Sequence, residues 1–155
     1  MRLALFQPDI PQNLGAAMRL SACFGVFLDV IEPCAFPVSD KSLKRAALDY
    51  GPKARIARHD GWEAFLADPA RREGRLVLFT TKASIRLDQA HLAPGDTLLF
   101  GQESAGVPDH VQGQAQVCVR IPMAPDARSL NLSVSAGIAL FEGLRQTGGW
   151  PEGAL

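Results

Sequence analysis

Hydrophobic and polar positions along the chain fall into short blocks that predict strands alternating with helices. Compact apolar runs typical of buried strands lie at residues 2–7, 28–31, 76–80, 97–100 and 117–121, and a weaker run at 55–59 predicts an edge strand. Apolar residues at helical spacing predict helices at 12–24, 40–48, 62–67 and 132–144. This alternation predicts an α/β fold with a mostly parallel sheet and helices on both of its faces.

The stretch from residue 121 to residue 141 combines a strand end, a short polar loop and a helix with one apolar face. Ser129 or Asn131 can cap this helix, because a short side-chain oxygen accepts a hydrogen bond from an unpaired N–H of the first turn. Small residues along the helix, such as Ser133, Ala136 and Gly137, permit another backbone to come close. A loop of this kind suits polar chemistry in an α/β enzyme, and an ordinary strand–loop–helix connection explains it equally well.

Parallel sheets bind their ligands beyond the carboxyl ends of the strands, and this rule selects the loops at 80–84, 101–108 and 123–131. In the second loop, Gly101 and Gly106 let the backbone bend and approach a ligand. Glu103 places a carboxylate inside that bend. A wide turn without any function would show the same spacing.

A further polar pair, Asn13 and Arg19, lies in the first predicted helix. Arg19 follows Asn13 by two helical turns or less, so its side chain can share a face with the loop that precedes the helix. An arginine whose charge is simply solvated on the helix surface is the alternative.

The charge of the chain is balanced, since 16 Lys and Arg residues meet 16 Asp and Glu residues. No global basic field therefore indicates a nucleic-acid partner, and such a partner must be met by a local patch. One span of the sequence is rich in basic residues, and it can be explained as an RNA contact or as a solvated helix face. The residues of this span that we predict to contact RNA are Lys41, Lys44, Arg45, Lys53 and Arg55.

Several common kinds of site find no support in the sequence, which has no GxGxxG motif after a strand, no Walker-type GK[ST] and no serine nucleophile elbow. The three cysteines stand far apart among apolar residues, so they predict buried thiols and no metal site: Cys23, Cys34 and Cys118. The three histidines fall in predicted loops and surface positions, so we expect them to be solvated: His59, His91 and His110.

No apolar run approaches the length of a membrane span, and the N-terminus opens into a strand-like segment without the layout of a signal peptide. We therefore expect a cytoplasmic protein with no membrane partner. With 155 residues, 47% of them hydrophobic, the chain is expected to form one domain over residues 1–155. Residues 148–155 are expected to fray.

Three segments match, in order and spacing, the motifs of a known family: PDIPQNLGAAMRL, LLFGQESAGVP and IPMAPDARSLNLSVSAGIAL. Together they resemble the SPOUT-class RNA 2′-O-ribose methyltransferases. The chain is most similar to the small tRNA (cytidine/uridine-2′-O)-methyltransferases, which act on the wobble nucleotide, and the likeness covers nearly the whole chain. It departs from the common pattern at Ala83, where relatives often have glycine, and in the amino-acid sequence of the loop at 102–105.

The resemblance implies a parallel α/β domain whose C-terminal part forms a trefoil knot, a feature too rare to propose from periodicity. It implies that S-adenosylmethionine binds in a bent form within the knot. It also implies a homodimer, with each site completed across the interface, and the tRNA anticodon stem-loop as partner. By position, the residues that would hold the cofactor are Phe79, Thr80, Gly101, Glu103, Gly106, Ile121, Met123, Ser129 and Leu130.

By the same resemblance, Arg19 is the activating residue of the reaction. A guanidinium does not lose its proton near neutral pH, because its pKa lies above about 12. We therefore expect Arg19 to stabilise the developing alkoxide or to clamp a neighbouring phosphate. The resemblance and the polar character of their side chains assign the orienting role to Asn13, Glu103, Ser129 and Asn131.

Three alternatives compete with this interpretation. The chain could be a 2′-O-methyltransferase for ribosomal RNA, or a catalytically silent RNA-binding protein of the same fold. It could also be an unrelated flavodoxin-like module, although the loop after the first strand reads Gln-Pro-Asp-Ile-Pro instead of being rich in Ser, Thr and Gly.

Overall fold

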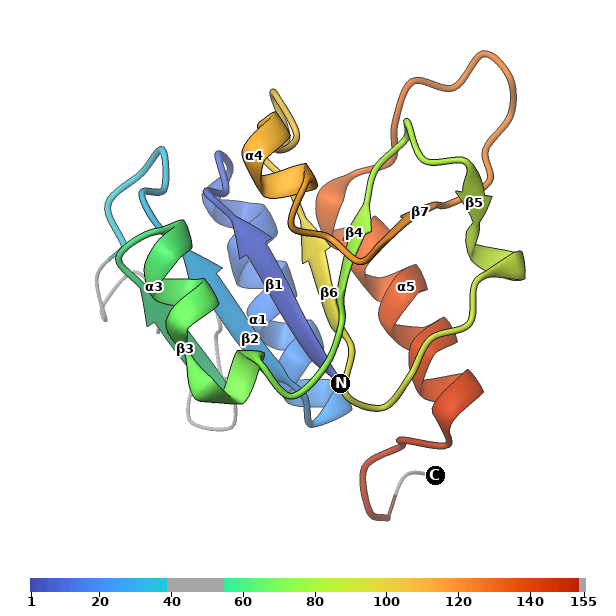
Figure 1. Cartoon of the computed structure of the whole chain (residues 1–155), viewed down its shortest axis with the longest axis horizontal. Coiled ribbons are helices and arrows are strands. Elements are labelled where there is room, and N and C mark those ends of the chain that lie inside the picture. Colours follow the sequence, from blue (N-terminus) through green and yellow to red (C-terminus); the bar gives the residue numbers. More distant parts are fainter. Residues whose placement is uncertain (39–54, 154–155) are drawn as a thin grey trace.

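The computed structural model describes residues 1–38 and 55–153, and its centre is a seven-stranded sheet in which all paired strands are parallel (Figure 1). The strand order is β3-β2-β1-β6-β4-β7-β5. The strands are β1 (Arg2–Phe6), β2 (Phe27–Ile31), β3 (Arg55–His59), β4 (Leu76–Phe79), β5 (Ile85–Arg86), β6 (Thr97–Phe100) and β7 (Val117–Arg120). The helices are α1 (Pro11–Phe24), α3 (Trp62–Ala67), α4 (Asp109–Gln112) and α5 (Leu132–Thr147), with 3-10 turns η2 (Pro69–Arg71) and η3 (Leu87–Gln89).

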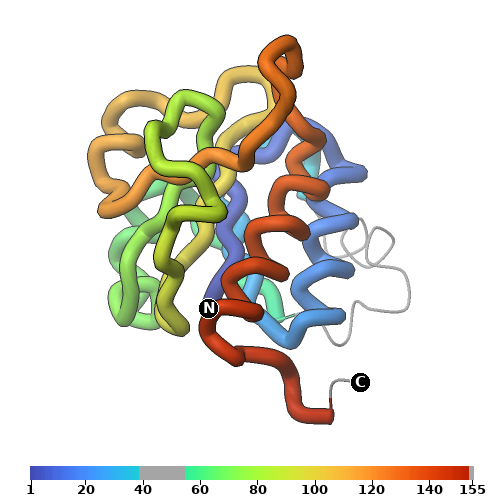
Figure 2. The backbone as a smooth tube through the Cα atoms, turned by 90° about the vertical axis from the view of Figure 1, so that its right-hand side faces the viewer, coloured from blue at the N-terminus to red at the C-terminus, as the bar shows by residue number. Residues whose placement is uncertain are grey.

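Helices cover both faces of this sheet, which confirms the predicted layers. Successive residues of a strand point to opposite faces, so Leu3 and Leu5 join one core while Ala4 and Phe6 join the other. The first core lies under α1 and α5, which lie side by side in Figure 2. The second lies under α3 and α4 and is the smaller of the two. The central strands β1, β6 and β4 are thus buried on both faces, which explains their continuous apolar sequences.

The helix ends follow from local chemistry. Pro11 opens α1, where a missing N–H costs nothing, and Gly25 ends it in the left-handed conformation at φ 66°, as its position predicted. Asn131 caps α5, since its side chain accepts hydrogen bonds from the N–H groups of Ser133 and Val134. Of the two predicted caps, Asn131 is therefore correct and Ser129 is not.

Some predicted boundaries were wrong by a residue, and four of the described elements were missed. Helix α1 begins at Pro11, and Gln7, Thr80 and Ile121 lie just outside their strands. The missed elements are too short for a periodic pattern to reveal them: strand β5, helix α4 and the 3-10 turns η2 and η3. The helix predicted at 40–48 lies outside the described residues, and the trefoil knot stays a prediction. Within residues 1–38 and 55–153, no helix is long and apolar enough to cross a membrane.

The tail does not fray at Gly148 as expected. Gly148 ends α5 in the left-handed conformation, and the chain then turns back so that the Trp150 ring lies 5.2 Å from the ring of Phe141 and 6.3 Å from that of Phe24. Aromatic contacts with α1 and α5 thus hold the segment after the helix.

The predictions for the cysteines and for one histidine were also wrong. Cys23 is exposed because it lies on the outer side of α1, and Cys34 and Cys118 are half-buried. Burial and the nearby carboxylate of Glu32 raise the pKa of the Cys34 thiol to about 11, so it is protonated at neutral pH. His59 points into the smaller core, where its Nε2 lies 2.9 Å from Oδ1 of Asp29. His91 and His110 are exposed, as expected.

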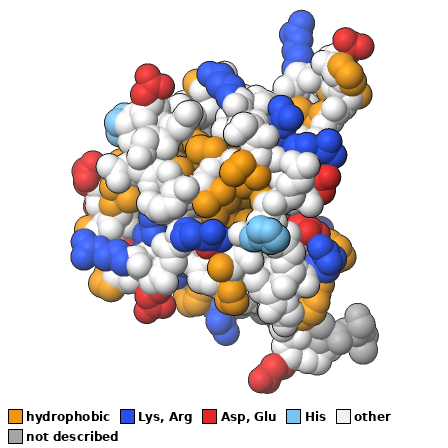
Figure 3. Space-filling view, turned by 45° about the vertical axis from the view of Figure 1, so that its right-hand side comes forward, with side chains coloured by type: hydrophobic (Ala, Val, Ile, Leu, Met, Phe, Trp, Pro, Cys, Tyr) orange, Lys and Arg blue, Asp and Glu red, His pale blue; other side chains and the backbone are white. Residues whose placement is uncertain are grey.

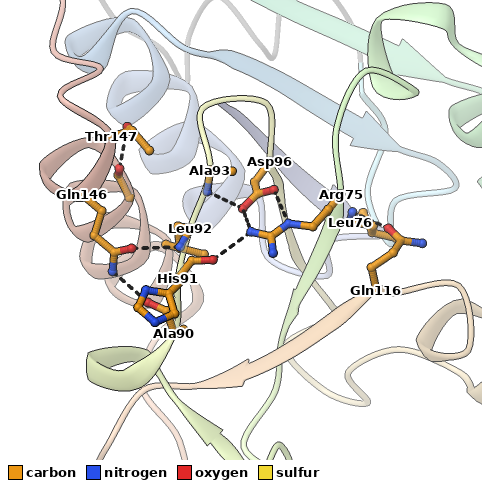
Figure 4. Close-up of polar contacts among 11 residues, drawn as sticks. Arg75, Leu76, Ala90, His91, Leu92, Ala93, Asp96, Gln116, Gln146 and Thr147 are labelled. Carbon is orange, nitrogen blue, oxygen red and sulfur yellow. Dashed lines mark hydrogen bonds and ion pairs between the residues drawn. The ribbon is translucent and has the colours of Figure 1, made fainter.

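Polar contacts at the amino edge of the sheet connect the segment before β6 to β4 and to α5 (Figure 4). The buried carboxylate of Asp96 accepts hydrogen bonds from Nε and Nη2 of Arg75 at 2.9 and 2.7 Å, and from the Ala93 N–H at 2.7 Å. On α5, Gln146 accepts from the Leu92 N–H at 2.8 Å and donates to the Ala90 carbonyl at 3.0 Å. These contacts fix where β6 begins.

Replacing Asp96 with alanine should lower the free energy of unfolding by about 1–3 kcal/mol, because it strands a buried N–H and removes the partner of Arg75. Urea denaturation followed by circular dichroism measures this change. Asp88→Ala is the matched control, since Asp88 holds Arg86 in an exposed pair and its loss should change stability little. Equal effects of the two substitutions would contradict this role of Asp96.

Candidate active site

A cavity of about 480 Å³ opens beyond the carboxyl ends of β6 and β4, and a smaller cavity of about 80 Å³ adjoins it. The larger one is lined by residues 79–82 from the end of β4 onward, by 100–103 and 105–107 from the end of β6 onward, and by 129–132 up to the start of α5. The three loops selected by the sheet rule therefore meet at one place.

The predicted cofactor-binding residues gather around these two cavities. Ile121 and Met123 line the smaller one, which shares Phe79, Thr80, Ser129 and Leu130 with its neighbour. The residues of the predicted set that line the larger cavity are Phe79, Thr80, Gly101, Glu103, Gly106, Ser129 and Leu130.

The loop after β6 is a tight bend closed by its own backbone. The N–H of Gln102 donates to the Gly106 carbonyl at 2.8 Å, and the N–H of Gly106 donates to the Gln102 carbonyl at 2.9 Å. A Cβ on Gly101 would lie 2.4 Å from the carbonyl carbon of Gly106, and Gly106 has φ 72°. Both positions therefore require glycine, and the bend carries Glu103 into the cavity.

A chain of hydrogen bonds joins Glu103 to residues from the other two motifs. Its Oε1 accepts from Nδ2 of Asn13 at 2.8 Å, and its Oε2 accepts from the N–H of Asp9 at 2.8 Å. Oδ1 of Asn13 accepts in turn from Nδ2 of Asn131 at 2.9 Å. Because the Asn131 oxygen also caps α5, one chain orients the first helix, the bend after β6 and the last helix.

Sequence reasoning missed Asp9, whose position in the first motif after a strand could have indicated its role. The Asp9 carboxylate accepts hydrogen bonds from both the N–H and the hydroxyl of Ser104. These hydrogen bonds fix the position of the bend that carries Glu103. Gln7, also missed, has φ 46° and lies within hydrogen-bonding distance of Gln102.

The apolar part of the cavity wall is aromatic. The rings of Phe79 and Phe100 lie 4.9 Å apart and only 14° from parallel, and both residues line the two cavities. A wall with a flat apolar surface, a fixed carboxylate and exposed loop backbone suits a ligand that is part planar and part polar.

Arg19 lies outside this arrangement. It is exposed and lines neither cavity, whereas Asn13 is buried. Six residues of an α-helix correspond to a rotation of about 240°, so the two side chains leave α1 in different directions. Arg19 therefore does not line the cavity of its own chain, and its role in the site stays a prediction.

Arg55 is far from the cavity as well. It lies at the amino end of β3, the edge strand, and its guanidinium lies 5.5 Å from the centre of the Phe27 ring. The other residues predicted to bind RNA lie outside the described residues: Lys41, Lys44, Arg45 and Lys53.

Among the described residues, one cluster has the composition of a metal site, formed by Asp29, His59 and Asp68 within 4.8 Å of one another. None of its members lines the cavities. Arg2 already holds both carboxylate oxygens of Asp29, at 2.8 and 2.7 Å, which makes this a buried ion-pair cluster.

Comparisons with known proteins agree with this arrangement. The chain matches the SpoU rRNA Methylase family over residues 1–141. It is 49% identical over 146 residues to a tRNA (cytidine(34)-2′-O)-methyltransferase of Beijerinckia indica, covering 94% of this chain and 91% of the relative. A protein of the same name from Escherichia coli is 39% identical over 150 residues, covering 96% of this chain and 94% of the relative.

Two solved structures are similar over nearly all of this chain. One, described as giving structural insights into the 2-OH methylation of C/U34 on tRNA, has a TM-score of 0.86 and 42% identity, with 94% of each chain covered. An AdoMet-bound rRNA methyltransferase from Sinorhizobium meliloti has a TM-score of 0.81 and 30% identity, covering 93% of this chain and 55% of its own. From its sequence and its fold alike, this chain belongs to the SpoU rRNA methylase family.

Proposed function

We propose that this protein transfers a methyl group from S-adenosylmethionine to the ribose 2′-hydroxyl of the wobble cytidine or uridine of tRNA. The observation that carries the proposal is that residues from three separate motifs line one cavity and are linked by the Glu103–Asn13–Asn131 chain. Identity to the curated wobble-position tRNA methyltransferases reaches 49%, against 30% to the ribosomal RNA methyltransferase, which favours tRNA as substrate. Such a substrate places the reaction in the cytoplasm.

The residues around the cavity fit the proposed cofactor. A volume of about 480 Å³ falls within the usual range of small-molecule sites. Phe79 and Phe100 offer an apolar wall for a planar base, while the backbone at Gly106, where a Cβ would meet nothing within 4 Å, is open to close approach. When bound, S-adenosylmethionine supplies an electrophilic methyl group on a sulfonium.

The chemical task of the protein is to make a weak nucleophile attack. A ribose hydroxyl must lose its proton as it reacts, and general base assistance is typically worth ~10²–10⁴ in rate. Arg19 stays protonated, so its proposed role is to stabilise the developing alkoxide or to hold the adjacent phosphate. Glu103, Asn13 and Asn131 orient the site, and Ser129 lies at the cavity wall.

We further propose that Arg19 acts in the site of a second copy of the chain. The exposed surface of α5 carries Val134, Ile138 and Phe141, which share one side of the helix and are 50%, 40% and 52% exposed. An apolar helix surface of this kind fits a homodimer interface, and α5 packs directly against α1, which bears Arg19. A dimer over these two helices would bring Arg19 to the partner's cavity.

The proposed reaction is tested with purified protein, labelled S-adenosylmethionine and bulk tRNA from a strain that lacks the gene. We expect a 2′-O-methylated wobble C or U in the nucleosides analysed by mass spectrometry. Cofactor binding with methyl transfer only to ribosomal RNA would contradict the tRNA assignment. Absence of transfer to any RNA would support a silent RNA-binding protein.

Arg19→Ala should abolish methyl transfer while leaving cofactor affinity nearly unchanged, because Arg19 lines neither cavity. Glu103→Ala should also abolish transfer, because it removes the carboxylate from the cavity. Mixing the two inactive proteins tests whether Arg19 acts across the dimer. Each mixed dimer would contain one intact site, so random exchange in a two-fold dimer should restore about a quarter of wild-type activity.

A mixture that stays inactive, although native mass spectrometry shows mixed dimers, would place Arg19 in the site of its own chain. Loss of cofactor binding by Arg19→Ala alone would contradict its assignment altogether.

Asn131 has two roles that substitution can separate. Asn131→Ala removes the cap of α5, which should cost ~1 kcal/mol of stability, and also removes the donor to Asn13. Asn131→Asp keeps a capping oxygen for α5 but replaces the N–H donor by a carboxylate oxygen that faces the acceptor of Asn13, so the cap is retained and the hydrogen bond to Asn13 is lost. We expect both variants to lose activity, by ~10²-fold, because Asn13 is no longer held in place. Full activity of Asn131→Asp would show that only the cap matters.

A further inference from the structure

The positive charges of the described residues divide into two groups. Most are engaged within the chain: five arginines form ion pairs with carboxylates, Arg71 and Arg72 donate to backbone carbonyls, Arg55 lies over the Phe27 ring, and Arg19 also has an interaction partner. The paired arginines are Arg2, Arg58, Arg75, Arg86 and Arg145.

Across the part of the chain that the structure describes, the cations whose side chains have no hydrogen-bond, ion-pair or ring partner are Lys82, Arg120 and Arg128. All three are exposed. An unpaired cation keeps its full charge available for a ligand, whereas a paired one must first give up its carboxylate.

These three residues lie at the same edge of the sheet, on the side of the cavity. Lys82 follows β4 and lines the cavity itself, while Arg120 ends β7, whose Val119 carbonyl accepts a hydrogen bond from the Thr80 N–H at 2.9 Å. Arg128 directly precedes Ser129, another residue of the cavity wall. Figure 3 shows Lys and Arg side chains at the upper end of the molecule and on the loop that projects there, with others in the lower half of the same face.

The neighbouring carboxylates leave this edge positive. The two carboxylate oxygens of Asp88 accept hydrogen bonds from Nε and Nη2 of Arg86, and Arg86 lies in register with Arg120 on the adjacent strand. Glu103 is occupied by Asn13 and Asp9, and Asp9 by Ser104. Asp126, exposed in the same loop as Arg128, is the remaining acidic side chain of that loop.

We propose that Lys82, Arg120 and Arg128 form the surface that binds the phosphate backbone of the substrate RNA, beside the nucleotide whose ribose enters the cavity. The inference rests on the proposed function and specifies where the RNA lies. The ribose that carries the reacting 2′-hydroxyl is bonded to a phosphate on each side. When this ribose enters the cavity, both phosphates lie at the cavity mouth, where cations can bind them. Arg55, by contrast, lies at the opposite end of its strand and faces an aromatic ring.

The test measures binding of a fluorescent anticodon stem-loop by anisotropy over a series of salt concentrations. The variant K82Q/R120Q/R128Q should bind at least about tenfold more weakly. Its dependence of log affinity on log salt should be shallower by about 2–3, since each lost phosphate contact removes ~0.7–0.9 from the slope. R72Q is the matched control, as Arg72 is exposed at the amino edge of the sheet and should stay within about twofold of wild type.

Far-ultraviolet circular dichroism of each variant shows that it is folded; cofactor affinity is not used for this purpose, because Lys82 lines the cavity. The proposal is overturned if the folded triple variant binds RNA like R72Q. Loss of RNA binding in R55Q, with none in the triple variant, overturns it as well. Wild-type protein that binds RNA through these residues without methylating it would refute the proposed reaction and retain the surface.

Discussion

The cavity depends on the in-register parallel pairing of β1, β6 and β4. Leu5 pairs with Phe100, and Phe100 pairs with Phe79, so the three strands end at the same level of the sheet. Their buried side chains on both faces hold that register, because a slip of one residue would exchange the two cores. The loops that follow the strands therefore start side by side, and the stacked Phe79 and Phe100 rings form a wall at their base.

Above this base, hydrogen bonds replace apolar packing as the organising interaction. Glu103, Asn13 and Asn131 are separated by 90 and 118 positions in sequence, yet each satisfies the next. Asn13 is buried, and a buried amide left without a partner is costly, so its hydrogen bonds to Glu103 and Asn131 favour the arrangement in which all three loops are in place. The same contacts fix the direction of α5 through its cap. The exposed surface has two further features. Helix α5 carries an apolar stripe, and the cations Lys82, Arg120 and Arg128 lie at the cavity mouth.

Much of this arrangement could be predicted from sequence. Apolar runs reveal strands that are buried on both faces, glycines reveal the bend at 101–106, and the carboxyl-end rule brings the three loops together. Periodicity could not place Arg19 relative to the cavity, because the direction of its side chain depends on which side of α1 packs against the sheet. It also failed at His59, where an edge strand turns a polar residue inward toward Asp29. Cys23 was misjudged because apolar neighbours in sequence do not determine which side of α1 is covered.

The central claim is that this cavity holds S-adenosylmethionine, and its most direct test is the cofactor affinity of Gly101→Ala measured by isothermal titration. A Cβ at residue 101 would collide with the Gly106 backbone at 2.4 Å, so the bend that shapes the cavity would have to open. Our account predicts clear binding by the wild-type protein and a loss of at least about tenfold in the variant, with its far-ultraviolet circular dichroism unchanged. Equal affinities in the two folded proteins would show that the cofactor binds elsewhere.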